Sequence, residues 1–398
     1  MRKNVLIVAA PFGYGPVARA LLVAQALADV ADITILSSGD AYRFATRFMR
    51  GPIVGREGVF RSVYADAADL APFDLFISIN NDPAVHHLVH MGLEARTVFV
   101  DSILAWRSVN SPVRFRKPIL GYLAQDFPGV ASGLADCQAQ IVELTAPMVW
   151  NSPAVERARP PRASPATGDD RGCTRVAPVS LQQRRAVTLH LGGVTSPLVS
   201  WEMLRRPIEA IFRRSVALAR RHGRRLVVVG NRHLGDLSVG DGDVEILGDV
   251  SPPEAAALVG DSEILLSTPG IGAVYEALAC RVPVILLPPM NSTQLIQYGV
   301  FAQRGFPGSM HARAGAALLQ AATSIPWDRQ TAYSIDFLSR NLSAALAELP
   351  RQMARLLGDD TGATARQEAL RVQADFLGAL SRTSAVEIMR KVLLGALP

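Results

Sequence analysis

Short apolar runs rich in β-branched residues alternate with helical patterns over much of the chain. This alternation is typical of parallel β-sheets in which helices connect successive strands. Two series of strands are predicted. The first comprises residues 4–10, 32–37, 73–79, 96–101 and 147–151. The second comprises residues 186–191, 225–230, 244–247, 263–266 and 283–288, with helices over residues 197–222, 253–260, 272–281 and 293–304.

The segment between the two series, residues 155–185, is rich in proline, arginine and small polar residues and lacks the periodicity of a helix or a strand. Such a composition is typical of an interdomain linker. It separates a domain over residues 1–154 from a second over 186–310, and residues 311–398 are a helical segment expected to pack on both. The expected fold class is α/β: two Rossmann-like, doubly wound parallel-sheet domains that face each other across a cleft, with C-terminal helices.

The composition excludes several classes of protein. Every apolar stretch is interrupted before about eighteen residues, so no transmembrane segment is expected, and the start of the chain suits a first strand better than a signal peptide. We therefore expect a cytoplasmic protein. The net charge is +6, but the arginines are dispersed and no basic run alternates with aromatic residues, so no nucleic-acid partner is expected. Three cysteines without a C-x-x-C spacing favour reduced thiols over disulfides or zinc.

A turn of small residues follows the strand predicted at 263–266. In open parallel sheets, ligands bind beyond the carboxyl ends of strands, where helix N-termini present unpaired N–H groups and partial positive charge. Ser267, Thr268, Gly270 and Gly272 supply hydroxyl and backbone donors at such a place, which suits a diphosphate. Glu276 follows one helical turn later, where an ionised carboxylate is placed to accept hydrogen bonds from both hydroxyls of a ribose.

The stretch from 244 to 294, VEILGDVSPPEAAALVGDSEILLSTPGIGAVYEALACRVPVILLPPMNSTQ, resembles the donor-binding half of GT-B glycosyltransferases. The UDP-sugar enzymes and the lipid-II-forming transferase are the most similar. The resemblance implies that the second domain binds a UDP-sugar and the first binds the acceptor. It also implies roles for single residues. The donor-site residues are Glu276 for the ribose, Val250 and Ser251 against the uracil, and Gln294, with Asn291 nearby, toward the sugar.

The chain departs from this pattern at two places. Many small-molecule UDP-sugar transferases carry a phosphate-binding His-Gly-Gly before the helix, where this chain has Thr268, Pro269 and Gly270. A hydroxyl and the helix N-terminus must then serve instead. Thr293 replaces the Asp that normally precedes the Gln. The alternative interpretation is that Glu276 is only an exposed helix residue beside an ordinary turn.

Two more glycine-rich turns follow strands. Gly192, Gly193 and Thr195 follow residues 186–191, and the GT-B pattern places them near the diphosphate, although an ordinary loop has a similar composition. Gly13, Tyr14 and Gly15 follow the first strand and, with Ala18, match the dinucleotide fingerprint G-x-G-x-x-A. The expected acidic residue at the end of the second strand is missing. We therefore assign this turn to acceptor binding rather than to an NAD site.

An inverting transferase needs a base to take the proton of the attacking atom. Asp101, at the end of strand 96–101, is the first candidate, with a helix N-cap as its alternative role, and His87 is the second. Asp126 also lies on the acceptor side. His86 and His90 share a helix face without a third ligand, and the D-x-D of Asp241 and Asp243 precedes a strand as a polar turn does. We expect no metal and no cofactor beyond the donor.

Three segments, AAPFGYGPVARALL, VFVDSILAW and AQDFPGV, resemble actinobacterial transferases that act on nucleosides, the cytosylglucuronate synthases among them. This resemblance implies UDP-glucuronate as donor, a pyrimidine nitrogen as nucleophile, and Arg19 or Arg107 near the sugar carboxylate. The predicted function is therefore sugar transfer from a nucleotide diphosphate sugar to a natural-product or nucleoside acceptor. The alternatives are a nucleotide-sugar 2-epimerase, a non-catalytic nucleotide-binding helper and an NAD-dependent dehydrogenase. The sequence leaves a homodimer open.

Overall fold

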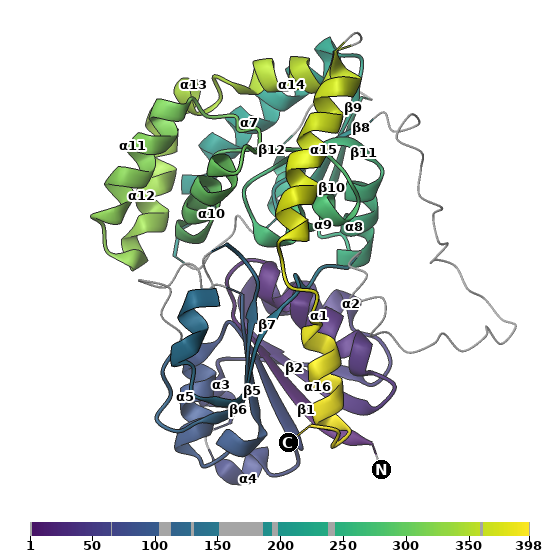
Figure 1. Cartoon of the computed structure of the whole chain (residues 1–398), viewed down its shortest axis with the longest axis vertical. Coiled ribbons are helices and arrows are strands. Elements are labelled where there is room, and N and C mark those ends of the chain that lie inside the picture. Colours follow the sequence, from purple (N-terminus) through teal and green to yellow (C-terminus); the bar gives the residue numbers. More distant parts are fainter. Residues whose placement is uncertain are drawn as a thin grey trace, which may run out of the picture. The chain divides into compact units, whose positions relative to one another are not determined.

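The computed structural model describes residues 2–64, 66–102, 113–128, 131–150, 186–192, 198–237, 243–358 and 361–397. Contacts divide the chain into two compact units (Figure 1). The first unit comprises Met1–Pro11, Pro16–Gln183 and Ser381–Pro398, and the second comprises Phe12–Gly15 and Arg184–Leu380. The turn after the first strand is thus grouped with the second unit, and the end of the chain with the first. The predicted linker, residues 155–185, lies outside the described residues.

The first unit is built on a seven-stranded sheet with strand order β3-β2-β1-β4-β5-β6-β7. Every neighbouring pair is parallel. The middle strands β4 and β5 are buried along their whole length, as expected for a parallel sheet covered by helices on both faces. The strands are β1 (Lys3–Ala9), β2 (Ala31–Ser37), β3 (Ile53–Glu57), β4 (Leu75–Ile79), β5 (Thr97–Asp101), β6 (Ile119–Gln125) and β7 (Ala139–Thr145).

The helices of this unit are α1 (Gly15–Leu27), α2 (Gly39–Phe48), α3 (Phe60–Val63), α4 (Ala67–Leu70), α5 (Asp82–His90) and α16 (Ala385–Leu393), with 3-10 turns at Glu94–Arg96 and Ala131–Asp136. The last helix, α16, lies beside α1 (Figure 1). Arg390 of α16 donates to the Asp29 carboxylate at 2.7 Å and to the carbonyl of Ala26 at 3.1 Å. The Ala146 amide donates to the Thr383 carbonyl at 2.6 Å. These contacts hold the end of the chain in the first unit.

The second unit contains a five-stranded parallel sheet with strand order β10-β9-β8-β11-β12. Its strands are β8 (Ala186–His190), β9 (Arg225–Gly230), β10 (Val244–Gly248), β11 (Ser262–Ser267) and β12 (Val284–Leu286). The connecting helices are α7 (Trp201–Arg221), α8 (Pro252–Gly260), α9 (Ile271–Ala279) and α10 (Ser292–Gln303), with a 3-10 turn at Arg232–Asp236. An α-helix follows β8, β10, β11 and β12, as the sequence pattern predicts, and the 3-10 turn follows β9.

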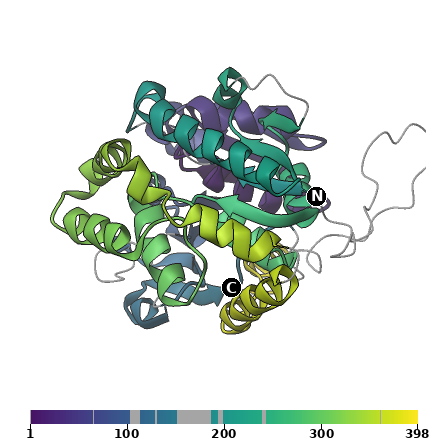
Figure 2. The same cartoon turned by 90° about the horizontal axis from the view of Figure 1, so that it is seen from above.

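Helices without strands complete the second unit. They are α11 (Ala312–Thr323), α12 (Trp327–Arg340), α13 (Leu342–Ala345), α14 (Leu349–Leu357) and α15 (Gly362–Gly378). Helices α11 and α12 lie side by side in both views (Figures 1 and 2). Phe376 of α15 packs against Tyr275 of α9 and Phe301 of α10, with ring centroids 6.2 and 5.3 Å away. This aromatic cluster fixes the helix that carries Glu276.

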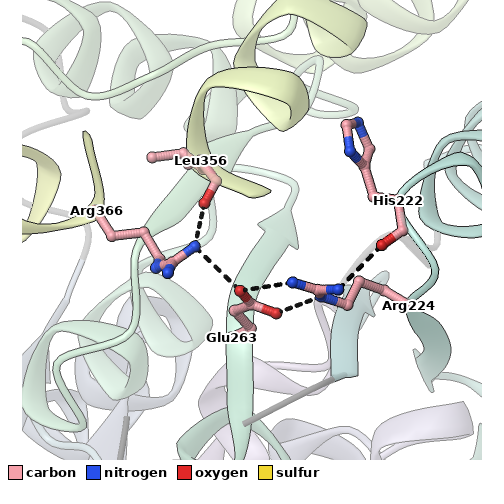
Figure 3. Close-up of polar contacts among 5 residues, drawn as sticks. All are labelled: His222, Arg224, Glu263, Leu356 and Arg366. Carbon is pink, nitrogen blue, oxygen red and sulfur yellow. Dashed lines mark hydrogen bonds and ion pairs between the residues drawn. The ribbon is translucent and has the colours of Figure 1, made fainter. Parts of the chain in front are cut away.

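The amino end of the second sheet holds a buried ion cluster (Figure 3). Glu263, near the start of β11, is only 7% exposed, and its carboxylate accepts from Arg224 Nε at 2.6 Å and from Arg366 Nη1 at 3.0 Å. Arg224 also donates to the carbonyl of His222 at 3.0 Å, and Arg366 to the carbonyl of Leu356. One carboxylate thereby joins β11, the start of β9 and α15.

The predicted fold class is confirmed. Predicted strands lie within two residues of the observed ones, except that the described residues of 147–151 form no strand. The patterns missed β3, β6 and β7. β6 contains Gly121 and only one β-branched residue, Ile119. A Cβ at Gly121 would lie 3.3 Å from Val98, so glycine permits close packing against β5. The edge strand β7 is only half-buried and lacks a continuous apolar run.

Candidate functional site

The strand order of the second sheet defines its ligand position. The chain starts at β8 in the middle, moves to β9 and β10 on one side, and then to β11 and β12 on the other. The order therefore reverses between β8 and β11, and ligands of open α/β sheets bind beyond the carboxyl ends of strands at such a switch point. His190 of β8 pairs in register with Ser267 of β11 at this edge. The predicted turn after Ser267 lies at the switch point.

The turn from Ser267 to Gly272 presents backbone to its surroundings. The Ser267 hydroxyl donates to the Thr268 carbonyl at 2.7 Å, and the Gly270 amide donates to the same oxygen at 2.6 Å. Gly270 is the N-cap of α9 and supplies no side chain to the first N–H groups of that helix. A Cβ built at Gly272 would have no atom within 4 Å. A helix N-terminus beside open space suits a bound anion.

Thr268 and Gln294 come from two segments that the resemblance assigned to the donor, and the structure brings them together. Gln294 Nε2 donates to Thr268 Oγ1 at 3.2 Å, and its Oε1 accepts from the Met290 amide at 2.8 Å. Both side chains are buried. The amide retains one N–H and one lone pair beyond these bonds. Any contact of Gln294 with a sugar would use that capacity.

Two predicted donor residues have capping roles. Asn291 Oδ1 accepts from the Gln294 amide at 2.9 Å and from the Thr293 hydroxyl at 2.7 Å, which begins α10. Ser251 forms a capping box with Glu254 at the start of α8, with bonds of 2.9 and 3.3 Å. Such caps are worth about 1 kcal/mol each. These local bonds explain both residues without a ligand, so their donor roles stay predictions.

Glu276 is 8% exposed on α9. The alternative that it is only an exposed helix residue is therefore wrong. A buried carboxylate is costly unless polar groups surround it, so its place in the helix requires a reason beyond solubility. It lies on the helix that starts at the switch point. Its assignment to a ribose stays a prediction.

The predicted nucleobase segment adjoins the turn after the first strand. Asp249, with a left-handed φ of 51°, accepts from the Arg232 amide at 3.1 Å and from the Tyr14 hydroxyl at 2.6 Å. Gly13 is buried in a left-handed conformation with φ 60°, and Gly15 begins α1. Contacts group all of Phe12–Gly15 with the second unit. Through Asp249, this turn is bonded to the residue directly before Val250, beside residues that the resemblance assigned to the donor.

Sequence reasoning overlooked His190. It ends the central strand β8, and a Cβ at Gly192 would lie 2.7 Å from its ring, so the loop passes close over the imidazole. Part of the residue reaches the surface, but burial lowers its pKa to about 4, and it is therefore neutral at pH 7. A histidine at a strand end, two residues before Gly192, was the available signal. Gly193 and Thr195 lie outside the described residues.

The candidate bases belong to the first unit and differ in burial. Asp101 has no exposed surface, and its carboxylate accepts from the Tyr122 hydroxyl at 2.5 Å. The expectation that it faces a cleft is therefore not met. His87 is half-buried on α5, with Nε2 3.2 Å from the Tyr64 carbonyl and its ring edge-on to Phe60. The catalytic roles of both residues stay predictions.

Arg19 and Asp126, the other predicted acceptor residues, are buried with partners of their own. Arg19 Nε donates to Gln125 Oε1 at 3.1 Å. Asp126 accepts from the Ser381 amide at 2.5 Å, and burial raises its pKa. Both bonds connect elements of the first unit, α1 to β6 and β6 to the returning end of the chain. Arg107 lies outside the described residues.

The described ranges contain no group of three or more His, Cys, Asp or Glu side chains that could hold a metal ion. Asp241 of the D-x-D lies outside these ranges, so the expected independence of metals stays a prediction. Among the described helices, none combines the length and apolar character that crossing a membrane requires.

Comparison with known proteins supports the fold. A family model described as CGA synthase-related protein matches residues 130–322, just under half of the chain. No curated protein matches significantly. Similar solved structures include Os79 from O. sativa in complex with UDP, with 12% identity, coverage of 98% of this chain and 99% of that chain, and a TM-score of 0.56.

Two further structures agree. Phytolacca americana UGT2, complexed with UDP-2fluoro-glucose and pterostilbene, has 12% identity, covers 99% of each chain and gives a TM-score of 0.54. Medicago truncatula UGT71G1, complexed with UDP-glucose, has 11% identity, covers 99% of this chain and 98% of its own, and gives a TM-score of 0.52. At such identities the likeness concerns the fold alone. The chain has the GT-B fold of UDP-glycosyltransferases, and the resemblance predicted from its sequence is confirmed.

Proposed function

We propose that this protein is a glycosyltransferase that moves a sugar from a UDP-sugar to a small-molecule acceptor. The observation that carries the proposal is the switch-point turn of the second sheet, where the bare N-terminus of α9 opens beside Gly272 and the same helix buries Glu276. The Thr268–Gln294 bond joins this turn to the start of α10. UDP complexes of proteins with the same fold support a nucleotide at this kind of site.

The reaction requires stabilisation of a leaving diphosphate. The bond between the anomeric carbon and the β-phosphate oxygen breaks, the acceptor atom bonds to that carbon, and its proton passes to a base. The N–H groups at the start of α9 offset the charge that develops on the UDP oxygens. Glu276 holds the ribose, so that binding energy from the nucleotide orients the sugar for attack.

The finer proposal is UDP-glucuronate as donor and a pyrimidine nucleoside or base as acceptor. It is supported by the segments that resemble cytosylglucuronate synthases and by the match to the CGA synthase-related family model. In this proposal Arg19 or Arg107 lies near the sugar carboxylate. Incubation with UDP-glucuronate, UDP-glucose and cytosine distinguishes the versions. Release of UDP only with UDP-glucuronate and cytosine is the expected result.

Calorimetric titration with UDP, GDP, TDP and NAD tests the nucleotide site. UDP should bind best, and Glu276→Ala should lower its affinity about tenfold or more because charge-assisted bonds to the ribose are lost. Glu368→Ala, on the exposed face of α15, is the matched control and should leave the affinity unchanged. Equal UDP affinity in wild type and Glu276→Ala contradicts the ribose role, and preferred binding of NAD contradicts the transferase.

A non-catalytic nucleotide-binding protein is the second candidate. The burial of Asp101, the first candidate base, favours it, because a carboxylate without exposed surface does not reach a bound molecule. UDP binding without any acceptor-dependent release of UDP from UDP-sugars would support this candidate. Acceptor-dependent release would exclude it.

A further inference from the structure

His190 lies at the edge of the second sheet where the candidate site is predicted. It is the last residue of β8, the strand at which the sheet order reverses, and it pairs in register with Ser267 on β11 and Val229 on β9. The predicted phosphate turn begins at Ser267. The imidazole and this turn therefore leave neighbouring strands at the same edge, and part of His190 is exposed.

The contact with Gly192 constrains the loop that leaves β8. A Cβ at this glycine would lie 3.3 Å from Nε2 of His190 and 2.7 Å from Cε1, and the second distance is shorter than real Cβ contacts. A side chain at position 192 would require the ring to shift, so the imidazole and the backbone of Gly192 are in close contact.

The chemistry of the ring suits a phosphate. Burial keeps the imidazole neutral, so one ring nitrogen carries an N–H donor and the other is an acceptor. A diphosphate presents only acceptor oxygens. A preorganised neutral donor beside the N-terminus of α9 adds a directed bond to an anion without placing a second buried charge in the site.

The chain also lacks the histidine that related enzymes carry before this helix, since Thr268 occupies that position and its hydroxyl binds Gln294. We propose that His190, from the neighbouring strand, replaces the missing histidine and donates a hydrogen bond to the diphosphate of the bound nucleotide. This inference rests on the proposed function. It assigns the phosphate contact to a residue that the family pattern does not place there.

A role in packing alone is the competing explanation. In that case His190 would hold the Gly192 loop in shape, and its loss would disturb the whole nucleotide site. The two explanations differ for ligands without phosphate. A phosphate donor contributes to UDP binding and nothing to uridine, whereas a packing residue affects both.

The test is calorimetric titration of wild type, His190→Ala and His190→Asn with uridine, UMP and UDP. For His190→Ala we expect a loss of about tenfold or more in UDP affinity, as for removal of a hydrogen bond to a charged group, with uridine affinity unchanged. His190→Asn keeps a neutral donor and should lose less. His222→Ala is the control, because this histidine follows α7 near the amino end of the sheet, and no affinity should change.

Equal losses for uridine and UDP, or an unchanged UDP affinity, overturn the proposal. If these variants fail to fold, the ring ¹⁵N chemical shifts of His190 in the wild-type protein provide the test. They should change when UDP is added and remain unchanged when uridine is added. Failure of the proposed function gives a different result. In that case the wild type would not bind UDP, or Glu276→Ala would not lower the UDP affinity. If only the His190 role is wrong, the wild type still binds UDP and Glu276→Ala still lowers the affinity.

Discussion

Polar residues have different kinds of partners at the two ends of the second sheet. At the amino end, Glu263 is 7% exposed and paired with Arg224 and Arg366, so the buried charge is matched within the protein. At the carboxyl end, Thr268 and Gln294 form a neutral bond, and the backbone at Gly272 borders open space. Polar groups at the first end connect structural elements. In the proposed function, those at the second end surround the bound nucleotide.

The comparison separates residues that maintain stability from residues that maintain binding. Charges satisfied internally contribute to the free energy of unfolding, while a helix N-terminus without a side-chain cap lowers stability slightly in exchange for an anion site. Variants at the two ends should therefore change different measurements.

The largest change in the free energy of unfolding is expected at the amino end of the second sheet. Glu263→Ala leaves two partly buried arginines without their carboxylate and should lower the free energy of unfolding by about 3 kcal/mol. Denaturant unfolding measures it. The UDP affinity of the folded variant should match that of wild type. A variant as stable as wild type, or one that is stable but no longer binds UDP, would contradict the assignment of stability to the amino end and of binding to the carboxyl end.

The next largest effect is expected for His190, in the pH dependence of the free energy of unfolding. Its pKa is about 4 in the folded protein against an ordinary value of 6.5. The unfolded chain therefore binds more protons between these values, and the contribution to stability is complete above pH 6.5 and lost as pH falls toward 4. Over this window wild type should lose about 2 kcal/mol more than His190→Asn, measured by denaturant unfolding. Parallel losses in both proteins would contradict the burial of the ring.

The smallest change in the free energy of unfolding is expected at Gly272, together with a loss of UDP affinity. Gly272→Ala adds a methyl group where no atom lies within 4 Å and should stabilise α9 by about 0.5 to 1 kcal/mol. The same methyl group should lower UDP affinity about tenfold if a phosphate approaches this backbone. Gly378→Ala, at the open end of α15, is the control that should leave binding unchanged. Unaltered UDP affinity in Gly272→Ala would show that the phosphate does not bind close to Gly272.

The sequence predicted much of the second unit because its signals are local. An apolar run, a small-residue turn and a helix succeed one another along the chain, so both the strands and the turn before Glu276 could be identified there. Edge strands such as β7 carry weaker patterns and were missed. Asp101 was predicted at a strand end, correctly, but strand position alone does not show whether a side chain is covered.

The sequence by itself determined the α/β class, the two sheets and the switch-point turn, because backbone propensity and apolar periodicity act over a few residues. Only the tertiary structure decided that His190 stands beside Ser267, that Arg366 completes the ion cluster of Glu263, and that the end of the chain returns to the first unit. Each depends on strand register or helix packing between residues far apart in the chain, and such pairings are selected by the burial of the whole core.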